Sequence, residues 1–274
     1  MTAPAARRQG PRTTSTGALV LAALLAACAT TPAVDGPIVR APAATPAPTA
    51  PPARFTVVSF NVHLGADPTA LAAELRRGGL GGADVYLIQE IEDHVPAEPR
   101  PRAEALAAAL GLAVVYAPAR ALDHGGLGNH GLAVLSRWPI VDDAVLRLPH
   151  HDLLWGTRPR IALGVILDVA GTPVQVWNVH LDTRIAVEDR VAQLAPVFAR
   201  ALALPGLAIV GGDLNTLVPV HAHAVDGLAA TQGFATPTAA LTATFPGSWW
   251  PPIPSARLDA IYARGFAVLG AGVD

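Results

Sequence analysis

The sequence contains no lysine and only one cysteine, and aromatic residues make up only 5% of its 274 positions. All 19 basic residues are arginines, against 21 acidic residues, which leaves a formal net charge of −2. Non-specific binding of duplex DNA depends on basic side chains, so this balance disfavours such a role without excluding a local basic groove. A single cysteine rules out an intrachain disulfide and a cysteine metal site.

The single cysteine, Cys28, closes an N-terminal segment that is typical of an export signal. Three arginines precede an apolar run from Gly17 to Ala27, which is too short for a membrane span of roughly 20 residues. Residues 25–28 resemble a bacterial lipobox, whose cysteine is lipidated; an ordinary secretory signal is the alternative. We therefore predict a signal peptide over 1–27 and a lipid anchor on the extracytoplasmic side of a bacterial cell envelope. The remaining chain has 16 basic against 21 acidic residues.

Composition divides the rest of the chain into two parts. Residues 28–53 are mostly Ala, Pro and Thr, a composition that buries too little apolar surface to fold and favours extended chain. We interpret them as a linker, with an edge segment packed on the domain as the alternative. Residues 54–274 are long enough for one large domain, whose core we expect to be mainly Val, Leu, Ile and Ala.

Within this domain, hydrophobic runs bounded by turn residues predict more strands than helices. The expected strands are 55–60, 83–88, 112–116, 131–136, 161–169, 174–179, 207–210, 257–263 and 267–269. The expected helices are 68–77, 101–110 and 188–202. Consecutive strands often lack a helix between them, which favours two stacked sheets flanked by helices over one doubly wound sheet.

Residues 207–215 contain the most informative pattern in the sequence. An apolar run stops at Gly211 and Gly212 and is followed by Asp213 and Asn215. In an extended chain residues two apart share a side, so a carboxylate and a carboxamide would lie together. This pair suits a phosphate and its attacking water, whereas alone an Asp-x-Asn after a strand is more often a turn or a helix cap.

Several other predicted strands also end in, or contain, polar side chains. These residues are Asn61, Glu90, Asn178, His180 and Asp259. Each alone has a simple explanation, such as a turn, a solvated charge, a core histidine or an edge charge. Buried polar groups need partners, however, and the economical partners for the whole set are each other, a divalent metal and a phosphate.

The order of these polar positions resembles the endonuclease/exonuclease/phosphatase superfamily, the fold of DNase I, from about Phe55 onward. Further shared landmarks are residues 131–139, the helix containing Arg190 to Gln193, and the tripeptide 244–246. The resemblance implies an α/β protein with a four-layered α/β/β/α sandwich, which agrees with the strand-rich pattern.

The resemblance also implies a metal-dependent site. Glu90 would bind Mg²⁺ or Mn²⁺, because hard cations take carboxylate oxygens, and Asn61 would support the metal and its phosphate. Asn178 and His180 would contact the scissile phosphate, with His180 stabilising the charge of the transition state. Asp213 would orient or deprotonate the attacking water.

Three further residues complete the predicted site. Asn215 would position the attacking water beside its neighbouring carboxylate. Arg158 or Arg160 is a candidate clamp for phosphate oxygens, with a surface salt bridge as an equal alternative.

One part of the family pattern has no counterpart in this sequence. Relatives end in a Ser-Asp-His motif on a final strand, whose histidine pairs with the aspartate matching Asp259; the printed sequence lacks both motif and strand. Three explanations stay open: a truncated sequence, another histidine in its place, or a chain that binds without catalysing. The candidate replacements are His150, His151, His221 and His223. Losing a general base typically costs about 10²–10⁴-fold in rate.

We therefore predict a divalent-metal-dependent phosphoester hydrolase, in the first place a phosphodiesterase, tethered to the cell envelope. The candidate substrates are nucleic acid, a phospholipid head group or a small phosphoester. The alternative is a catalytically impaired surface lipoprotein of the same fold that binds a phosphorylated ligand or a partner. We expect selectivity to lie in the loops 123–130, 149–159 and 247–255, and a monomer is the default.

Overall fold

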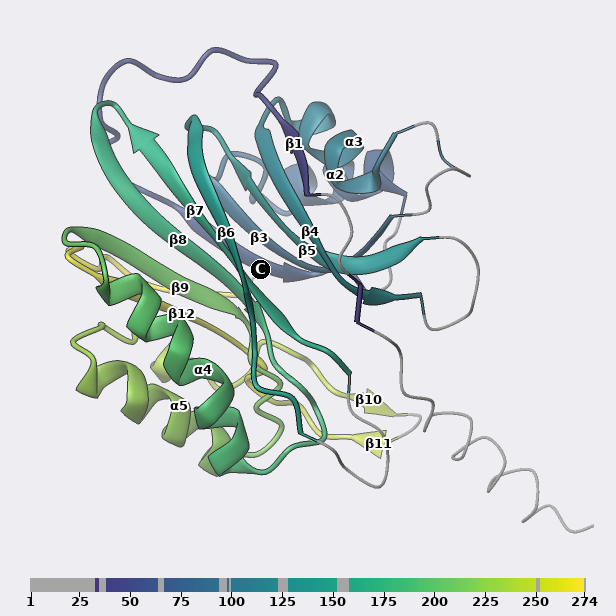
Figure 1. The fold of residues 1–274 in the computed structure, drawn as a ribbon, viewed down its shortest axis with the longest axis vertical. Coiled ribbons are helices and arrows are strands. Elements are labelled where there is room, and N and C mark those ends of the chain that lie inside the picture. Colours follow the sequence, from purple (N-terminus) through teal and green to yellow (C-terminus); the bar gives the residue numbers. More distant parts are fainter. Residues whose placement is uncertain are drawn as a thin grey trace, which may run out of the picture.

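The computed structural model describes residues 33–34, 38–63, 67–93, 98, 100–122, 128–151, 158–249 and 252–273. Two five-stranded sheets lie face to face, and helices cover their outer faces (Figure 1). The first sheet has the order β1-β4-β5-β3-β2. Its strands are β1 (Val39–Ala41), β2 (Val57–Asn61), β3 (Val85–Asp93), β4 (Ala113–Ala121) and β5 (Asn129–Ser136).

The second sheet has the order β12-β9-β8-β7-β6. Its strands are β6 (Ile140–Arg147), β7 (Ile161–Val169), β8 (Thr172–His180), β9 (Leu207–Asp213) and β12 (Asp259–Arg264). A separate hairpin pairs β10 (Ser248–Trp249) with β11 (Pro252–Ile253). In both sheets one neighbouring pair is parallel, β2 with β3 and β8 with β9.

Two helices cover each sheet, so the described chain forms the predicted four layers. Helices α2 (Pro68–Arg77) and α3 (Arg102–Leu110) pack on the first sheet. Helices α4 (Val187–Leu202) and α5 (Pro219–Thr231) pack on the second (Figure 1). A 3₁₀ turn, η1 (Pro237–Ala240), precedes the hairpin. None of the described helices is long and apolar enough to cross a membrane.

Strand β3 shows how the layers are held together. Val85 and Leu87 point into the core between the sheets, whereas Tyr86 and Ile88 point into the core beneath α2 and α3. Successive strand residues face opposite sides, so a strand in the middle of the sandwich must be apolar on both. This explains the nearly continuous hydrophobic runs that predicted the central strands.

The structure differs from the expected elements most clearly in three places. Residues 140–147 form β6, which we did not predict because it is a half-exposed edge strand containing two aspartates, a residue depleted in strands. Residues 219–231, for which we predicted no helix, form α5, whose alanine-rich sequence has a weak apolar face. The strand expected at 267–269 is absent, because those exposed residues run past the sheet without pairing.

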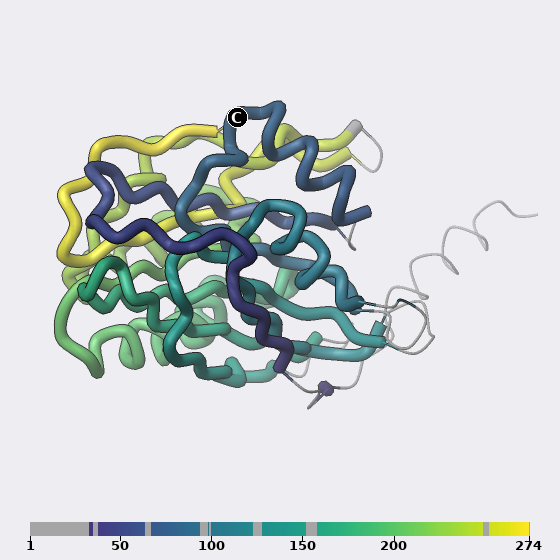
Figure 2. The backbone as a smooth tube through the Cα atoms, turned by 90° about the horizontal axis from the view of Figure 1, so that it is seen from above, coloured from purple at the N-terminus to yellow at the C-terminus, as the bar shows by residue number. Residues whose placement is uncertain are grey.

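The interpretation of residues 28–53 as an unpacked linker also needs correction. Val39–Ala41 pairs with β4 at the edge of the first sheet, and the Arg40 guanidinium binds the Asp143 carboxylate on β6. In Figure 2 the purple segment after β1 runs over the surface of the domain before it enters β2. Within the described part of this stretch, β1 fits the alternative of a packed edge segment. The predicted signal peptide and Cys28 lie outside the described residues.

Candidate active site

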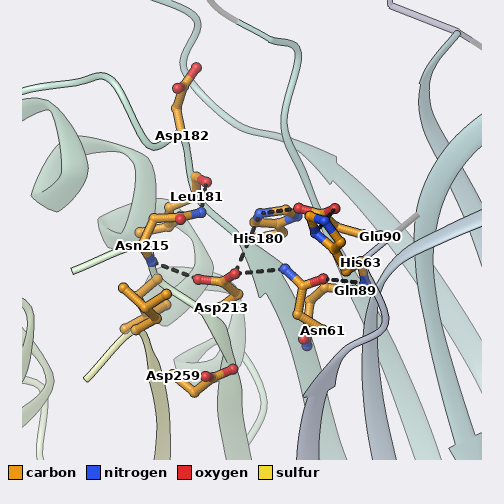
Figure 3. Close-up of polar contacts among 12 residues, drawn as sticks. Asn61, His63, Gln89, Glu90, His180, Leu181, Asp182, Asp213, Asn215 and Asp259 are labelled. Atoms are coloured by element: carbon orange, nitrogen blue, oxygen red, sulfur yellow. Dashed lines mark hydrogen bonds and ion pairs between the residues drawn. The ribbon is translucent and has the colours of Figure 1, made fainter. Parts of the chain in front are cut away.

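The ends of β2, β3, β8 and β9 meet between the two sheets, and their polar side chains turn towards one another (Figure 3). Asn61 ends β2, His180 ends β8 and Asp213 ends β9, while Glu90 lies within β3. The carboxyl ends of parallel neighbours lie at the same edge of a sheet, and stacking the sheets brings both edges together. The four predicted site residues at these strand ends therefore lie close together.

Glu90 is aimed into the site by a β-bulge. It is the extra residue between Gln89 and Ile91, which pair with consecutive residues of β5, and its φ of 59° is uncommon for a residue other than glycine. Its carboxylate lies within 4.0 Å of three histidines but forms no hydrogen bond in the described chain. The distances are 3.7 Å to His180, 3.9 Å to His130 and 4.0 Å to His63.

Asp213 is the most tightly held carboxylate of the site. The Asn61 side-chain amide donates to its Oδ2 and the Asn215 backbone N–H donates to its Oδ1, both at 2.8 Å. The Nε2 atom of His180 lies 3.7 Å from Oδ2. Burial, followed by the neighbouring Asp259 carboxylate, raises the pKa of Asp213 to about 7.

Asp259 lies opposite Asp213 in the β9–β12 register. Its carboxylate accepts hydrogen bonds from the hydroxyls of Ser59, at 3.1 Å, and Thr244, at 2.8 Å. Burial raises the pKa of Asp259. No histidine of the described chain contacts this carboxylate.

The four histidines considered as replacements therefore lie elsewhere. His221 and His223 are on α5, and His151 contacts Asp189, near the start of α4, at 3.3 Å. The histidines that do surround Glu90 are His63, His130 and His180.

His180 is buried at the centre of the cluster, with 4% of its surface exposed. Burial and the positive charges of Arg160, His130 and Arg120 hold the pKa of His180 well below its usual range. The imidazole is therefore neutral at pH 7. A neutral imidazole offers one N–H donor, which suits hydrogen bonding to a phosphoryl oxygen.

Asn178 does not take the predicted place against the phosphate. Its side chain is fully buried, and its oxygen accepts a hydrogen bond from Gln89 at 2.8 Å. Its nitrogen donates to the backbone oxygens of Ile88 and Ala133, both at 2.9 Å. These bonds join β8 to β3 and β5, so Asn178 holds the two sheets together behind the site.

Asn215 and Arg190 fix the loops that follow β8 and β9. The Asn215 amide donates to the Leu181 oxygen at 2.9 Å, and the residue adopts a positive φ of 52°. The buried Arg190 guanidinium of α4 donates to the backbone oxygens of Asp182 and Leu214, both at 2.7 Å. Together these bonds fix the distance between His180 and Asp213.

The predicted arginines occupy different environments. Arg160 has 7% of its surface exposed, which contradicts the surface salt bridge alternative, and burial lowers its pKa to about 10. In the described chain its guanidinium forms no hydrogen bond or ion pair, and its Nε atom is buried. The backbone N–H of Arg158 donates to Asp182 at 3.2 Å.

The sequence analysis did not select two buried basic residues at the same place, Arg120 and His130. Arg120 follows an apolar run near the end of β4, and His130 precedes Gly131 on β5. Arg120 shares the signal that identified the other site residues, a polar side chain at the end of a hydrophobic strand, whereas His130 stands at the start of its strand.

The donor set fits a metal that keeps most of its water ligands. The described residues contain no cluster of three or more His, Cys, Asp or Glu side chains that could enclose a cation. Mg²⁺ is usually held by one or two carboxylates together with water and substrate phosphate. The Glu90 carboxylate, with 19% of its side chain exposed and no hydrogen bond in the described chain, meets that requirement. The Asn61 oxygen already accepts the His63 N–H.

The chain is similar in sequence to one known protein family. Residues 58–274 match the sequence pattern of the group described as the Endonuclease/Exonuclease/phosphatase family. None of the curated proteins matches the chain.

Solved structures share the fold at low sequence identity. An endonuclease/exonuclease/phosphatase from Beutenbergia cavernae is 22% identical, with a TM-score of 0.56 over 77% of this chain and 63% of its own. Sphingomyelinase C from Streptomyces griseocarneus is 22% identical, with a TM-score of 0.55 over 78% and 85%. A mannosyl-6-phosphatase from Bacteroides thetaiotaomicron is 17% identical, with a TM-score of 0.56 over 77% and 85%. The chain thus spans less than two thirds of the first of these relatives.

Proposed function

Because the chain belongs to the Endonuclease/Exonuclease/phosphatase family, whose members are generally hydrolases, we propose that it is a metal-dependent phosphoester hydrolase. The observation that carries the proposal is the geometry of Asp213, held by two hydrogen bonds and lying 3.7 Å from His180. A carboxylate whose pKa is near 7 is matched to proton abstraction at neutral pH.

In the proposed reaction Asp213 accepts a proton from the attacking water as the water oxygen bonds to phosphorus. The bond between phosphorus and the ester oxygen breaks, and the departing alkoxide takes a proton from solvent. His180, which is neutral, donates a hydrogen bond to a phosphoryl oxygen as negative charge develops there. Asn61 and Asn215 keep the Asp213 carboxylate oriented through their hydrogen bonds.

Glu90 is the residue that would hold a divalent cation, with Asn61 beside it. Mg²⁺ or Mn²⁺ bound there would polarise the phosphoryl oxygen. Arg160 is the proposed clamp for phosphate oxygens, since its guanidinium is buried next to His180 and has no partner in the described chain.

The cellular setting is also part of the proposal. The lipobox-like residues at 25–28 support a lipid anchor at Cys28 and a place on the outer side of a bacterial membrane. Nucleic acid, a phospholipid head group and a small phosphoester remain the candidate substrates. Solved structures of the same fold carry the names sphingomyelinase C and mannosyl-6-phosphatase, so the fold supports more than one of these classes.

The test is hydrolysis of p-nitrophenyl phosphate and bis-(p-nitrophenyl) phosphate with Mg²⁺ or Mn²⁺. We expect Glu90→Ala and Asp213→Ala to lose at least about 10²-fold in kcat/KM. Asp142→Ala, an exposed residue of β6, is the matched control and is expected to keep full activity. Equal activity in all four proteins would refute the site assignment. A folded wild type that binds phosphate but turns over neither ester would favour the phosphate-binding alternative.

A further inference from the structure

A small pocket lined by basic side chains lies beside His180. Its volume is about 10 Å³, and its walls include Arg120, His130, Pro159 and Arg160. A cavity of this size accommodates a single water molecule or one oxygen atom. It has no room for a carbon substituent on that oxygen.

Two β-bulges that meet at Gly131 build this pocket. On one side of β5 the register shifts around Glu90, and on the other it shifts between Pro118 and Arg120. A bulge re-aims the side chains next to it, which turns Glu90 and Arg120 towards the same end of β5. A Cβ atom at Gly131 would lie 2.1 Å from the Ala117 oxygen, so only glycine fits where the bulges meet.

Arg160 provides the second observation that points to a ligand. Its guanidinium lines the pocket, has 7% of its surface exposed and forms no hydrogen bond or ion pair in the described chain. A buried charge without hydrogen bonds is costly, and such groups are normally paired. The carboxylates of Glu90, Asp182 and Asp213 act on Arg160 only at a distance. An anion that enters the pocket would supply the missing hydrogen bonds.

We propose that this pocket binds an unesterified oxygen of a terminal phosphate, so that the preferred substrate is a phosphomonoester. The inference rests on the proposed function and narrows its substrate class. It departs from the phosphodiester that the sequence favoured.

The geometry of in-line phosphoryl transfer explains why a monoester would be preferred. The attacking water and the leaving oxygen occupy opposite sides of phosphorus, which leaves three equatorial oxygens. In the proposed site a cation held by Glu90 would take one of these oxygens, the His180 N–H a second, and the pocket beside His180 the third. An oxygen that fills this small pocket leaves no space within it for a substituent. A diester carries its second substituent on one equatorial oxygen and would therefore lose one of the three interactions.

Charge favours the same substrate. Arg120 and Arg160 are both buried at this end of the site, with 2% and 7% of their surfaces exposed. A phosphomonoester carries close to two negative charges at pH 7, because its second pKa is about 6. A diester carries one charge, so the monoester is the stronger electrostatic partner for the buried Arg160 guanidinium.

The experiment compares kcat/KM for p-nitrophenyl phosphate and bis-(p-nitrophenyl) phosphate in wild type, Arg120→Met and Arg160→Met. One hydrogen bond to a charged group is worth about 10- to 100-fold, so we expect losses of that size for the monoester in each variant. Losses for the diester are expected to be smaller than about tenfold. Arg77→Met, an exposed arginine on α2, is the matched control and keeps both activities.

Two further measurements separate this inference from the proposed function and from misfolding. Arg120→Lys and Arg160→Lys keep the positive charge but not the planar guanidinium group. We expect both to retain more monoester activity than the matching Met variants. Calorimetric binding of methyl phosphate and dimethyl phosphate without metal tests the pocket even if neither ester is hydrolysed. We expect methyl phosphate to bind at least about tenfold more tightly, and Arg160→Met to remove the difference. A diester preference in wild type, or equal affinities for the two ligands, would overturn the inference.

Discussion

Replacing Asp213 by asparagine is expected to stabilise the folded protein at pH 8 while abolishing its proposed activity. Asp213 is 4% exposed and lies next to Asp259, so its negative charge is unfavourable in the folded state. An asparagine side chain carries no charge and still accepts the Asn215 N–H through its oxygen. It loses the hydrogen bond from Asn61, because two amide nitrogens would then face each other.

The magnitude follows from the pKa of Asp213. A rise from the usual 3.8 to about 7 corresponds to roughly 4 kcal/mol at about 1.4 kcal/mol per pKa unit. Losing one hydrogen bond offsets about 1 kcal/mol of that. We therefore expect Asp213→Asn to raise the free energy of unfolding by about 2–3 kcal/mol at pH 8.

The pH dependence has a definite sign. The folded protein holds the Asp213 proton more tightly than the unfolded chain, so wild type loses stability as the pH rises from 3.8 to about 7. The loss is complete above that window and absent below it. The advantage of the variant should therefore be large at pH 8 and disappear near pH 4.

Urea unfolding at several pH values, in EDTA so that no divalent cation contributes, measures this difference. Asp142→Asn, in which an exposed carboxylate of β6 is replaced, is the control and should stay within about 0.5 kcal/mol of wild type throughout. If Asp213→Asn is less stable than wild type at pH 8, or if its advantage does not change with pH, the reasoning about the buried carboxylate pair is wrong.

Three further predictions concern the framework of the site. Gly212→Ala should lower the free energy of unfolding by more than about 3 kcal/mol, because φ is 138° and a Cβ would lie 2.0 Å from the Val179 oxygen. The control is Gly171→Ala, where φ is 86° and the space is open, and it should lower the same quantity by about 1 kcal/mol in the urea assay. Asn178→Ala should lower the unfolding free energy by about 3 kcal/mol, measured by thermal melting, because three buried hydrogen bonds between the sheets are lost. Arg190→Met should reduce both stability and kcat, since two loop oxygens lose their donor; an unchanged kcat in the folded variant would contradict the positioning role.

The helices show which parts of the fold could be predicted from sequence. The bounds of α2 were predicted correctly because its signals are local: Asp67 accepts the N–H groups of Thr69 and Ala70, and Gly78 follows the last residue. Helix α5 carries a weaker signal, since Pro219 can begin a helix but the N-cap residue Val218 makes no side-chain hydrogen bond and the apolar face is weak. It is helical because Val225 and Ala229 pack in the core with α4 and the second sheet.

The site residues also divide into those that could be predicted from sequence and those that could not. Hydrophobic runs that end in polar residues identified Glu90, His180 and Asp213, and these three residues do come together. The same pattern selected Asn178, which turned out to join the sheets instead of facing the site. Both kinds of position look alike along the chain, because periodicity shows where a strand ends and not what packs against that end.

The sequence by itself determined where most of the central strands lie along the chain, the family and most of the polar residues at the strand ends, because spacing and chain order encode these features. Only the tertiary structure decided what each polar residue does. The β-bulges that aim Glu90 and Arg120, and the pocket around Arg160, depend on the register between strands and on the stacking of two sheets. Those contacts join residues far apart in the chain, so no local pattern specifies them.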